Sequence, residues 1–277
     1  MDSVGPIVEG RGKNFAVASL TVAEILAYVV ASALYLGHLL STRLSATRAA
    51  RVSLAVAFGL QLLDIGLRCA AGQNPVSSTP EAVGFVGFLV AGGFLGASFR
   101  YRLTTAGAFA VPAALTLVVL ARVVPAEPGS PRMGPLGLTH VFLATVGVAV
   151  FACAGVLAVL YLREERRLKQ KRFDRLVDES LSTLDRLALR CVSFGFPVFT
   201  LALVTGAVWV ARLGGIAAPE ARRPEYLMAV AAWLAFGVLL LARVGAGWRG
   251  QRAAWLTLGG FGGTLSVLLL YVLRYLG

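Results

Sequence analysis

Ionisable side chains within the apolar segments are the residues of this sequence that could do chemistry. A charged group or an imidazole is costly inside a lipid bilayer, so each one is a candidate for function. In chain order they are Glu24, His38, Asp64, Arg68, Glu81, Arg122 and His140. The sequence has two histidines in all, and a neutral imidazole at membrane depth could ligate haem iron.

The charged members of this set also have ordinary structural interpretations. Asp64 and Arg68 are spaced four residues apart in the favourable order, which predicts an ion pair along one helix. Glu81 opens an apolar segment, where a carboxylate stabilises the start of a helix. Arg122 closes another segment and could pair with a haem propionate, because guanidinium groups bind carboxylates in a bidentate manner. We therefore keep Arg122 as a candidate cofactor-binding residue.

The two histidines lie at different depths. His140 lies about four residues inside the start of the apolar segment 136–162, whereas His38 lies close to the end of the segment 18–40. At 1.5 Å per residue their depths differ by roughly 24 Å, so they cannot be the two axial ligands of one haem. We predict His140 as the iron ligand, with a structural role as the alternative, and keep His38 as a second candidate.

Composition decides which elements must position these residues. The chain has 277 residues, of which 57% are apolar and 14% charged, and its mean hydropathy is +0.77. Soluble domains are about 45–50% apolar and about 25% charged, so a soluble enzyme, a disordered chain and a disulfide scaffold are excluded. An outer-membrane barrel is also excluded, because its strands alternate apolar and polar residues. The remaining class is a helical membrane protein.

Eight apolar segments predict an all-α bundle with about eight transmembrane helices, forming a single integral membrane domain over 1–277. Six of the segments exceed the roughly 20 residues that cross a bilayer, and the third and seventh are slightly shorter. The segments are 18–40, 50–70, 83–99, 104–124, 136–162, 191–211, 226–243 and 253–275. Pro112 and Pro197 are the interior breaks, and the sequence shows no repeat of the kind found in inverted-repeat transporters.

The net charge of +12 is interpreted as a topology signal rather than as a nucleic-acid surface. The connections after the first, third, fifth and seventh segments, counted together with the charges at the ends of the segments, hold 17 of the 26 lysines and arginines. Basic residues gather on the cytoplasmic side, so both termini are predicted outside. The predicted location is the inner (plasma) membrane of the cell, crossed several times, with the lipid bilayer as partner.

One long polar segment, 163–190, connects the fifth and sixth apolar segments. It carries nine basic and six acidic residues, with Leu168, Val177, Leu181 and Leu184 near helical spacing. We predict a cytoplasmic amphipathic connector that continues the fifth helix and then lies at the membrane surface. A docking site for a cytoplasmic partner is the alternative to a solvated connector.

Motifs of catalysis are missing from the sequence. We find no nucleophile with a base at a suitable spacing, no phosphate-binding glycine loop and no metal-binding cluster. The glycine run at 259–263 lies inside an apolar segment, where it favours close helix packing. Cys69, Cys153 and Cys191 are far apart and form no redox motif. Because these motifs are missing, we predict that the protein is not an enzyme.

The first 17 residues lack an apolar core, so no cleavable signal peptide is predicted.

Five stretches stand out, in order along the chain. The stretch 137–162 carries His140 and precedes the basic connector. The other stretches are 74–81, 183–187, 194–197 with 205–209, and 247–255 with 259–261. Together they resemble the haem-handling cytochrome c assembly proteins of the CcsA/ResC kind and their HemX-like relatives. The resemblance covers the chain from about residue 60 to its end.

The resemblance implies a helical membrane protein that handles haem on the outer side for attachment to apocytochrome c. Full members carry a Trp-rich loop, W-G-x-x-W-x-W-D, flanked by histidines. Here the stretch after Trp209 contains neither tryptophan nor aspartate, and Gln73 or Asn74 and Leu241 or a neighbour stand where the family has histidine. Because His140 alone is retained, the chain resembles the shorter HemX-like branch more than a working synthase.

Three functions follow as hypotheses. The first is a non-catalytic accessory protein of cytochrome c biogenesis that binds or handles haem, with other cytochrome c assembly proteins as partners. The second is a HemX-like regulator of haem synthesis that acts through cytoplasmic protein contacts of 163–190. The third is a small-molecule transporter, which would need polar residues near the midplane and broken helices.

Overall fold

The computed structural model is all-helical over the residues it describes, which are 5–40, 44–124, 134–171, 179–212 and 223–276. Side chains are described at 18–38, 47–124, 134–171, 179–212, 223–270 and 272–273. The helices are α1 (Gly5–Leu40), α2 (Leu44–Ala70), α3 (Thr79–Arg100), α4 (Thr104–Val123), α5 (Pro135–Lys169), α6 (Leu181–Arg212), α7 (Pro224–Gly245) and α8 (Gln251–Leu276).

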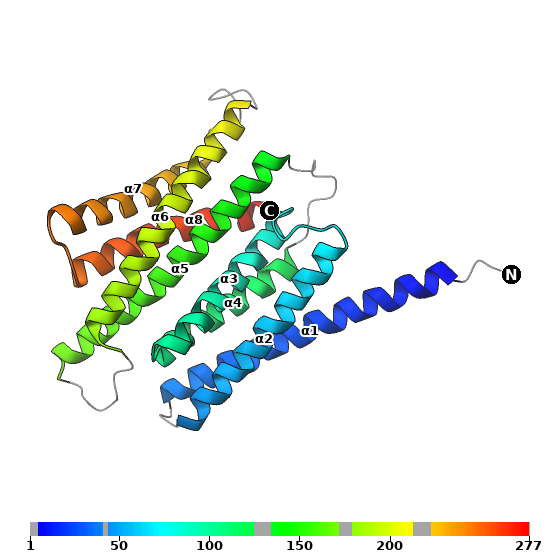
Figure 1. Cartoon of the computed structure of the whole chain (residues 1–277), viewed down its shortest axis with the longest axis horizontal. Coiled ribbons are helices and arrows are strands. Elements are labelled where there is room, and N and C mark those ends of the chain that lie inside the picture. The colour runs from blue at the N-terminus through cyan, green and yellow to red at the C-terminus, as the bar shows by residue number, and fades with distance from the viewer. Residues whose placement is uncertain (1–4, 41–43, 125–133, 172–178, 213–222, 277) are drawn as a thin grey trace.

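All eight helices are long and apolar enough to cross a membrane. The predicted all-α fold and the number of spans are thereby confirmed for the described residues, and the protein is a multi-pass membrane protein. Figure 1 shows consecutive helices alternating in sense along the bundle, with α1, α7 and α8 inclined to α5 and α6. The helices α1 and α5 therefore start at the same end, which the charge distribution predicts as the outer end; we call the opposite end the inner end.

The bundle consists of two halves with the same pattern of neighbours. In the first half α1 packs on α2 and α4, and α3 packs on α2 and α4; in the second half α5 packs on α6 and α8, and α7 packs on α6 and α8. The halves meet where α5 lies against α3 and α4. Equivalent helices, such as α1 and α5, are four places apart in the chain, and consecutive helices alternate in sense. The two halves therefore run in the same sense and are not inverted repeats.

Several helices extend beyond the apolar segments that predicted them. Helix α1 begins at Gly5 and α6 begins at Leu181, whereas the apolar segments begin at 18 and 191. Helix α5 continues to Lys169, so residues 163–169 and 181–190 of the predicted connector belong to two long helices. Residues 172–178 lie outside the described part. Hydropathy marks the length inside lipid, and a helix can continue past it with polar residues.

Local sequence explains where the helices begin and how they pass their prolines. Ser78 caps α3 by accepting a hydrogen bond from the backbone N–H of Glu81 at 3.4 Å, and Pro80 occupies the first turn, where proline is tolerated. Pro112 and Pro197 lie inside continuous helices, α4 and α6. Neither proline separates its helix into two elements, as a broken-helix transporter site would require.

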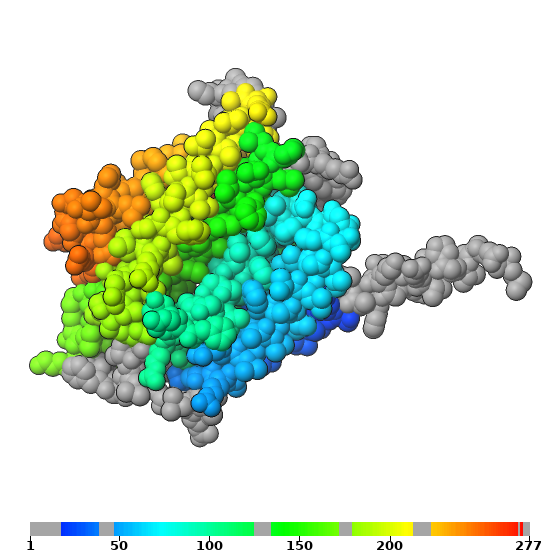
Figure 2. All heavy atoms as spheres, viewed as in Figure 1, coloured from blue at the N-terminus to red at the C-terminus, as the bar shows by residue number. Residues whose placement is uncertain are grey.

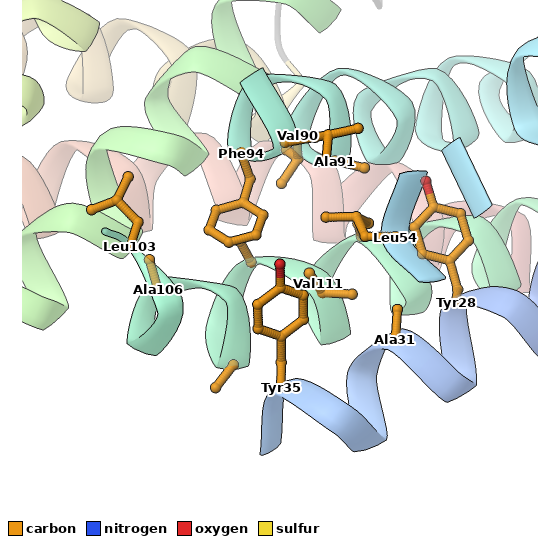
Figure 3. Close-up of a cluster of buried hydrophobic side chains, with 14 of the residues drawn as sticks. Tyr28, Ala31, Tyr35, Leu54, Val90, Ala91, Phe94, Leu103, Ala106 and Val111 are labelled. Atoms are coloured by element: carbon orange, nitrogen blue, oxygen red, sulfur yellow. The ribbon is translucent and has the colours of Figure 1, made fainter. Parts of the chain in front are cut away.

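The core of the first half is a cluster of buried apolar side chains that comes mainly from α1 to α4 and continues onto α5 and α6 (Figure 3). Tyr35 of α1 meets Phe94 of α3 edge to face, with ring centroids 5.5 Å apart. Gly107 of α4 makes this contact sterically possible, because a Cβ there would lie 2.3 Å from the Tyr35 ring. In the second half Phe151 stacks on Phe236 at 3.8 Å between centroids.

Replacing Gly107 by alanine is expected to destabilise the first half. The added methyl would also lie 2.8 Å from the Phe94 ring, and overpacking of this kind costs about 1–3 kcal/mol. Unfolding in detergent by a titration with dodecyl sulfate measures the free energy. The matched control is Gly96→Ala, where a Cβ meets no atom within 4 Å; it should leave stability unchanged or raise it. Equal stabilities of the two variants would contradict the prediction.

Candidate functional site

His140 lies in the second turn of α5 and faces α6. Its Nδ1 is 2.7 Å from the backbone carbonyl oxygen of Ala202. A carbonyl oxygen can only accept, so Nδ1 carries the hydrogen and the lone pair of the neutral ring is on Nε2. The imidazole is half-buried at the outer end of the bundle.

Three residues of α6 and α7 shape the wall beside this imidazole. Gly206 of α6 touches the ring: a Cβ there would lie 2.7 Å from Cε1 of His140. Trp209, one turn further along α6, has its ring centroid 6.1 Å from that of His140 at a tilt of 52°. Tyr226 of α7 donates a hydrogen bond from its hydroxyl to the Gly206 carbonyl at 3.2 Å. Glycine is needed at 206 for the imidazole to lie this close to α6.

The arrangement suits a histidine that binds a metal through Nε2. A ligating imidazole generally donates its other N–H to a backbone carbonyl or a carboxylate, which fixes the tautomer and the ring orientation. No group of three or more His, Cys, Asp or Glu that could hold a metal ion occurs among the described residues. Haem iron fits this situation, because the porphyrin supplies four nitrogens and the protein needs to add one or two ligands.

A second polar group, which we call the charge cluster, joins α1, α2 and α4 in the outer half of the bundle. It consists of Glu24, Asp64, Arg68 and Arg122. Arg68 Nε lies 2.9 Å from Asp64 Oδ2, which confirms the pair predicted from their spacing. Arg122 Nη2 lies 2.7 Å from Asp64 Oδ2 and 3.3 Å from Glu24 Oε2.

Both carboxylates of the charge cluster are buried, Glu24 completely and Asp64 with 2% of its surface exposed. Two guanidinium groups balance them. One oxygen of Glu24 (Oε1) and the Nε of Arg122 are buried without a hydrogen-bond partner in the described structure. Buried charges persist when they are paired in this way, because an isolated ion would be strongly destabilising there.

A cavity of about 370 Å³ adjoins the charge cluster. Its polar lining comes from Gln61, Asp64, Arg68, Asn74, Ser78, Glu81 and Arg122. Gln61 accepts a hydrogen bond from the Tyr28 hydroxyl at 2.7 Å and donates to the Gly84 carbonyl at 3.2 Å, so it is held in place by two helices. Glu81 lies in the first turn of α3, as predicted, with its carboxylate accepting a hydrogen bond from the Ser77 hydroxyl.

The predicted site residues are distributed over three places. His140 contacts α6 in the second half, whereas Arg122 is held by Glu24 and Asp64 in the first half. His38 lies two residues before the end of α1, at the inner end, so it is at the opposite end of the bundle from His140 (Figure 1). Its buried Nδ1 has no hydrogen-bond partner among the described residues. The structure does not bring the three together.

Sequence reasoning missed the partners of these residues. Gly206 and Trp209 are three residues apart, a spacing that places them on one helix face, and this was the signal that could have joined them to a site. The link between Glu24 and Arg122 spans 98 residues. Its signal was the presence of opposite charges at a similar depth in different helices.

Comparisons with known proteins give the family. A family model described as "Cytochrome C assembly protein" matches residues 79–277. Proteins named "Cytochrome c biogenesis protein CcsA" are similar to this chain: that of Guillardia theta is 27% identical over 217 residues, covering 69% of this chain and 71% of the relative. That of Thermosynechococcus vestitus is 38% identical over 80 residues, or 29% and 24% of the two chains.

The matches differ in how much of each relative they include. The Chlamydomonas reinhardtii CcsA protein is 27% identical over 126 residues, which is 45% of this chain and 34% of that protein. The chain thus spans well under two thirds of several relatives that it matches. No solved structure matches it.

Proposed function

Given that the chain belongs to the cytochrome c assembly protein family, we propose that it is a membrane accessory protein of cytochrome c biogenesis that binds haem through His140. The single observation that carries this proposal is the geometry of His140. Its Nδ1–H is directed to the Ala202 carbonyl at 2.7 Å, which leaves the lone pair of Nε2 available for a metal. The similarity to relatives named for cytochrome c biogenesis supports the same role.

The aromatic surroundings support a planar ligand. Trp209 offers an indole face beside the imidazole, and Tyr226 fixes the α6 backbone from α7. The Trp-rich loop of full family members is missing from the sequence after Trp209. We therefore propose a site that holds haem with one histidine and one flanking tryptophan, with no catalytic step assigned to the protein.

Two wider parts of the proposal rest on the family and on charge. We propose the inner (plasma) membrane as the location, with His140 on the outer side, because basic residues concentrate at the opposite end. Other cytochrome c assembly proteins are the proposed partners. The two alternative functions gain no specific support. A transporter with broken helices is not favoured, because α4 and α6 run unbroken through their prolines. A regulator that acts through the connector 163–190 is not favoured, because much of that connector belongs to α5 and α6.

An absorbance spectrum of the purified full chain tests the haem proposal. After expression with excess haem precursor, the protein in detergent should show a Soret band, and its intensity should rise to one haem per chain on titration with haem. Protein expressed without haem supply is the control that should gain the band only on titration. A chain that shows no Soret band after expression with haem precursor and after titration with haem would contradict the proposal.

A further inference from the structure

Three arginines converge at the inner end of the bundle, between the end of α3 and the start of α6. They line a cavity of about 410 Å³, which we call the arginine recess. Its lining residues are Arg100, Tyr101, Thr183, Arg186, Leu187 and Arg190. Guanidinium groups favour anions that present several oxygen atoms, such as phosphates and carboxylates.

The positive charge of the arginine recess is not neutralised within the described residues. Arg190 donates to the Tyr101 hydroxyl at 3.4 Å, Arg186 donates to the Ser182 carbonyl at 3.3 Å, and Arg100 lies over the Tyr101 ring at 5.8 Å. None of the three is within ion-pair distance of a described carboxylate.

The neighbouring carboxylates that the structure describes have other partners. Asp185 pairs with Arg243 at 2.9 Å, and Glu179 accepts a hydrogen bond from the backbone N–H of Arg102 at 2.7 Å. The start of α6 adds the positive end of a helix dipole to the same place. Among the described residues the recess therefore has an excess of positive charge, and its guanidinium groups have donors with no carboxylate partner.

The arginine recess continues into an apolar groove toward the middle of the bundle. Leu187 and Arg190 line both the recess and this second cavity of about 380 Å³. The rest of the groove is apolar and comes from α3, α4, α5 and α6, for example Gly93, Phe94, Ala106, Ala149 and Phe194. Figure 2 shows that the surfaces of α3 and α6, two of the helices that line the groove, border each other on one side of the bundle.

We propose that the arginine recess and the apolar groove form one binding site for an anionic phospholipid. The phosphate group would lie against Arg100, Arg186 and Arg190, and an acyl chain would follow the groove. Basic pockets between transmembrane helices on the cytoplasmic side bind anionic headgroups. A lipid is favoured over a free anion because the polar recess and the apolar groove share two lining residues, so a phosphate in the recess and an acyl chain in the groove can belong to one molecule.

The full chain in a neutral detergent provides the test, by native mass spectrometry with phosphatidylglycerol and phosphatidylcholine of identical acyl chains. We expect the wild type to retain phosphatidylglycerol far better than phosphatidylcholine. Replacing Arg100, Arg186 and Arg190 together by glutamine should weaken phosphatidylglycerol binding by about a hundredfold, since each arginine near a headgroup contributes about 1 kcal/mol. The matched control replaces Arg48, Arg249 and Arg252 by glutamine. These three arginines are exposed at the same end of the bundle, and the control variant should still prefer phosphatidylglycerol to phosphatidylcholine.

A second variant, Gly93→Leu, tests the groove. A Cβ at position 93 would lie 3.5 Å from the Cys153 sulfur, which is ordinary contact, so the longer side chain should enter the groove without forcing the helices apart. We expect Gly93→Leu to weaken phosphatidylglycerol binding. Inorganic phosphate should still compete for the arginine recess as it does in the wild type, because this substitution leaves the three arginines in place.

Four results would overturn the lipid proposal. They are equal retention of the two lipids by the wild type, unchanged binding in the triple arginine variant, binding of inorganic phosphate with no effect of Gly93→Leu on the lipid, and displacement of the lipid by haem. The proposal concerns the inner end of the bundle, so it does not depend on whether His140 binds haem.

Discussion

Replacing Arg122 by glutamine is expected to lower the free energy of unfolding by about 3–5 kcal/mol, the range observed when one partner of a buried ion pair is removed. Arg122 is the common partner of Glu24 and Asp64, at 3.3 and 2.7 Å. Without it, Arg68 remains for Asp64, but Glu24 keeps a completely buried carboxylate with no described cation to pair with. The measurement is unfolding in mixed detergent micelles.

Two control variants separate charge pairing from other effects of the Arg122 substitution. Arg212→Gln removes an exposed arginine at the same end of the bundle and should change stability by less than about 1 kcal/mol. Combining Arg122→Gln with Glu24→Gln should recover much of the loss, since the double variant removes the buried charge that was left alone. A loss from Arg122→Gln no larger than that from Arg212→Gln would refute the structural importance of the charge cluster.

The charge cluster bears on function through Arg122. A guanidinium held by two carboxylates is a poor partner for a haem propionate, because a propionate would have to displace one of them. We therefore propose a structural role for Arg122, which links α1, α2 and α4, and keep His140 as the haem ligand of the proposed function. Haem binding that survives in the Arg122→Gln, Glu24→Gln double variant would agree with this division of roles.

Hydropathy predicted the fold class because a transmembrane helix must be apolar over its whole span, whatever its neighbours are. The ends of the helices were less predictable. The first turns of α1 and α6, from Gly5 and Leu181, are helical although they contain charged and polar residues. Such turns lie beyond the apolar segments, so hydropathy contains no information about them.

Contacts within one helix were predictable and contacts between helices were not. The pair of Asp64 and Arg68 follows from a spacing of four residues and was found at 2.9 Å. The hydrogen bond from His140 to Ala202 joins residues that are 62 positions apart, and its acceptor is a backbone carbonyl, which no residue type signals. The candidate site could thus be predicted as one residue, His140, but not as a constellation.

Replacing His140 by alanine should abolish most haem binding. Substitutions that disturb only the residues supporting a metal ligand cost about 10–100-fold in metal affinity, so loss of the proposed ligand itself should cost more than about a hundredfold. The Soret band of the purified variant should be lost or shifted, and titration with haem should not restore the wild-type spectrum. His38→Ala is the matched control, because it removes the other histidine, at the opposite end of the bundle, and should keep the band.

Gly206→Ala makes the prediction for His140 more specific. A methyl group at position 206 would lie 2.7 Å from Cε1 and 3.0 Å from Nδ1 of the imidazole, so the ring must turn away from Ala202 and lose its hydrogen bond. We expect haem affinity to fall by about 10–100-fold, while the imidazole itself is retained and the fold persists. Normal haem binding in Gly206→Ala, together with loss in His140→Ala, would mean that iron ligation does not depend on the Ala202 contact. Normal binding in both variants would remove His140 from the site and leave haem to another part of the bundle.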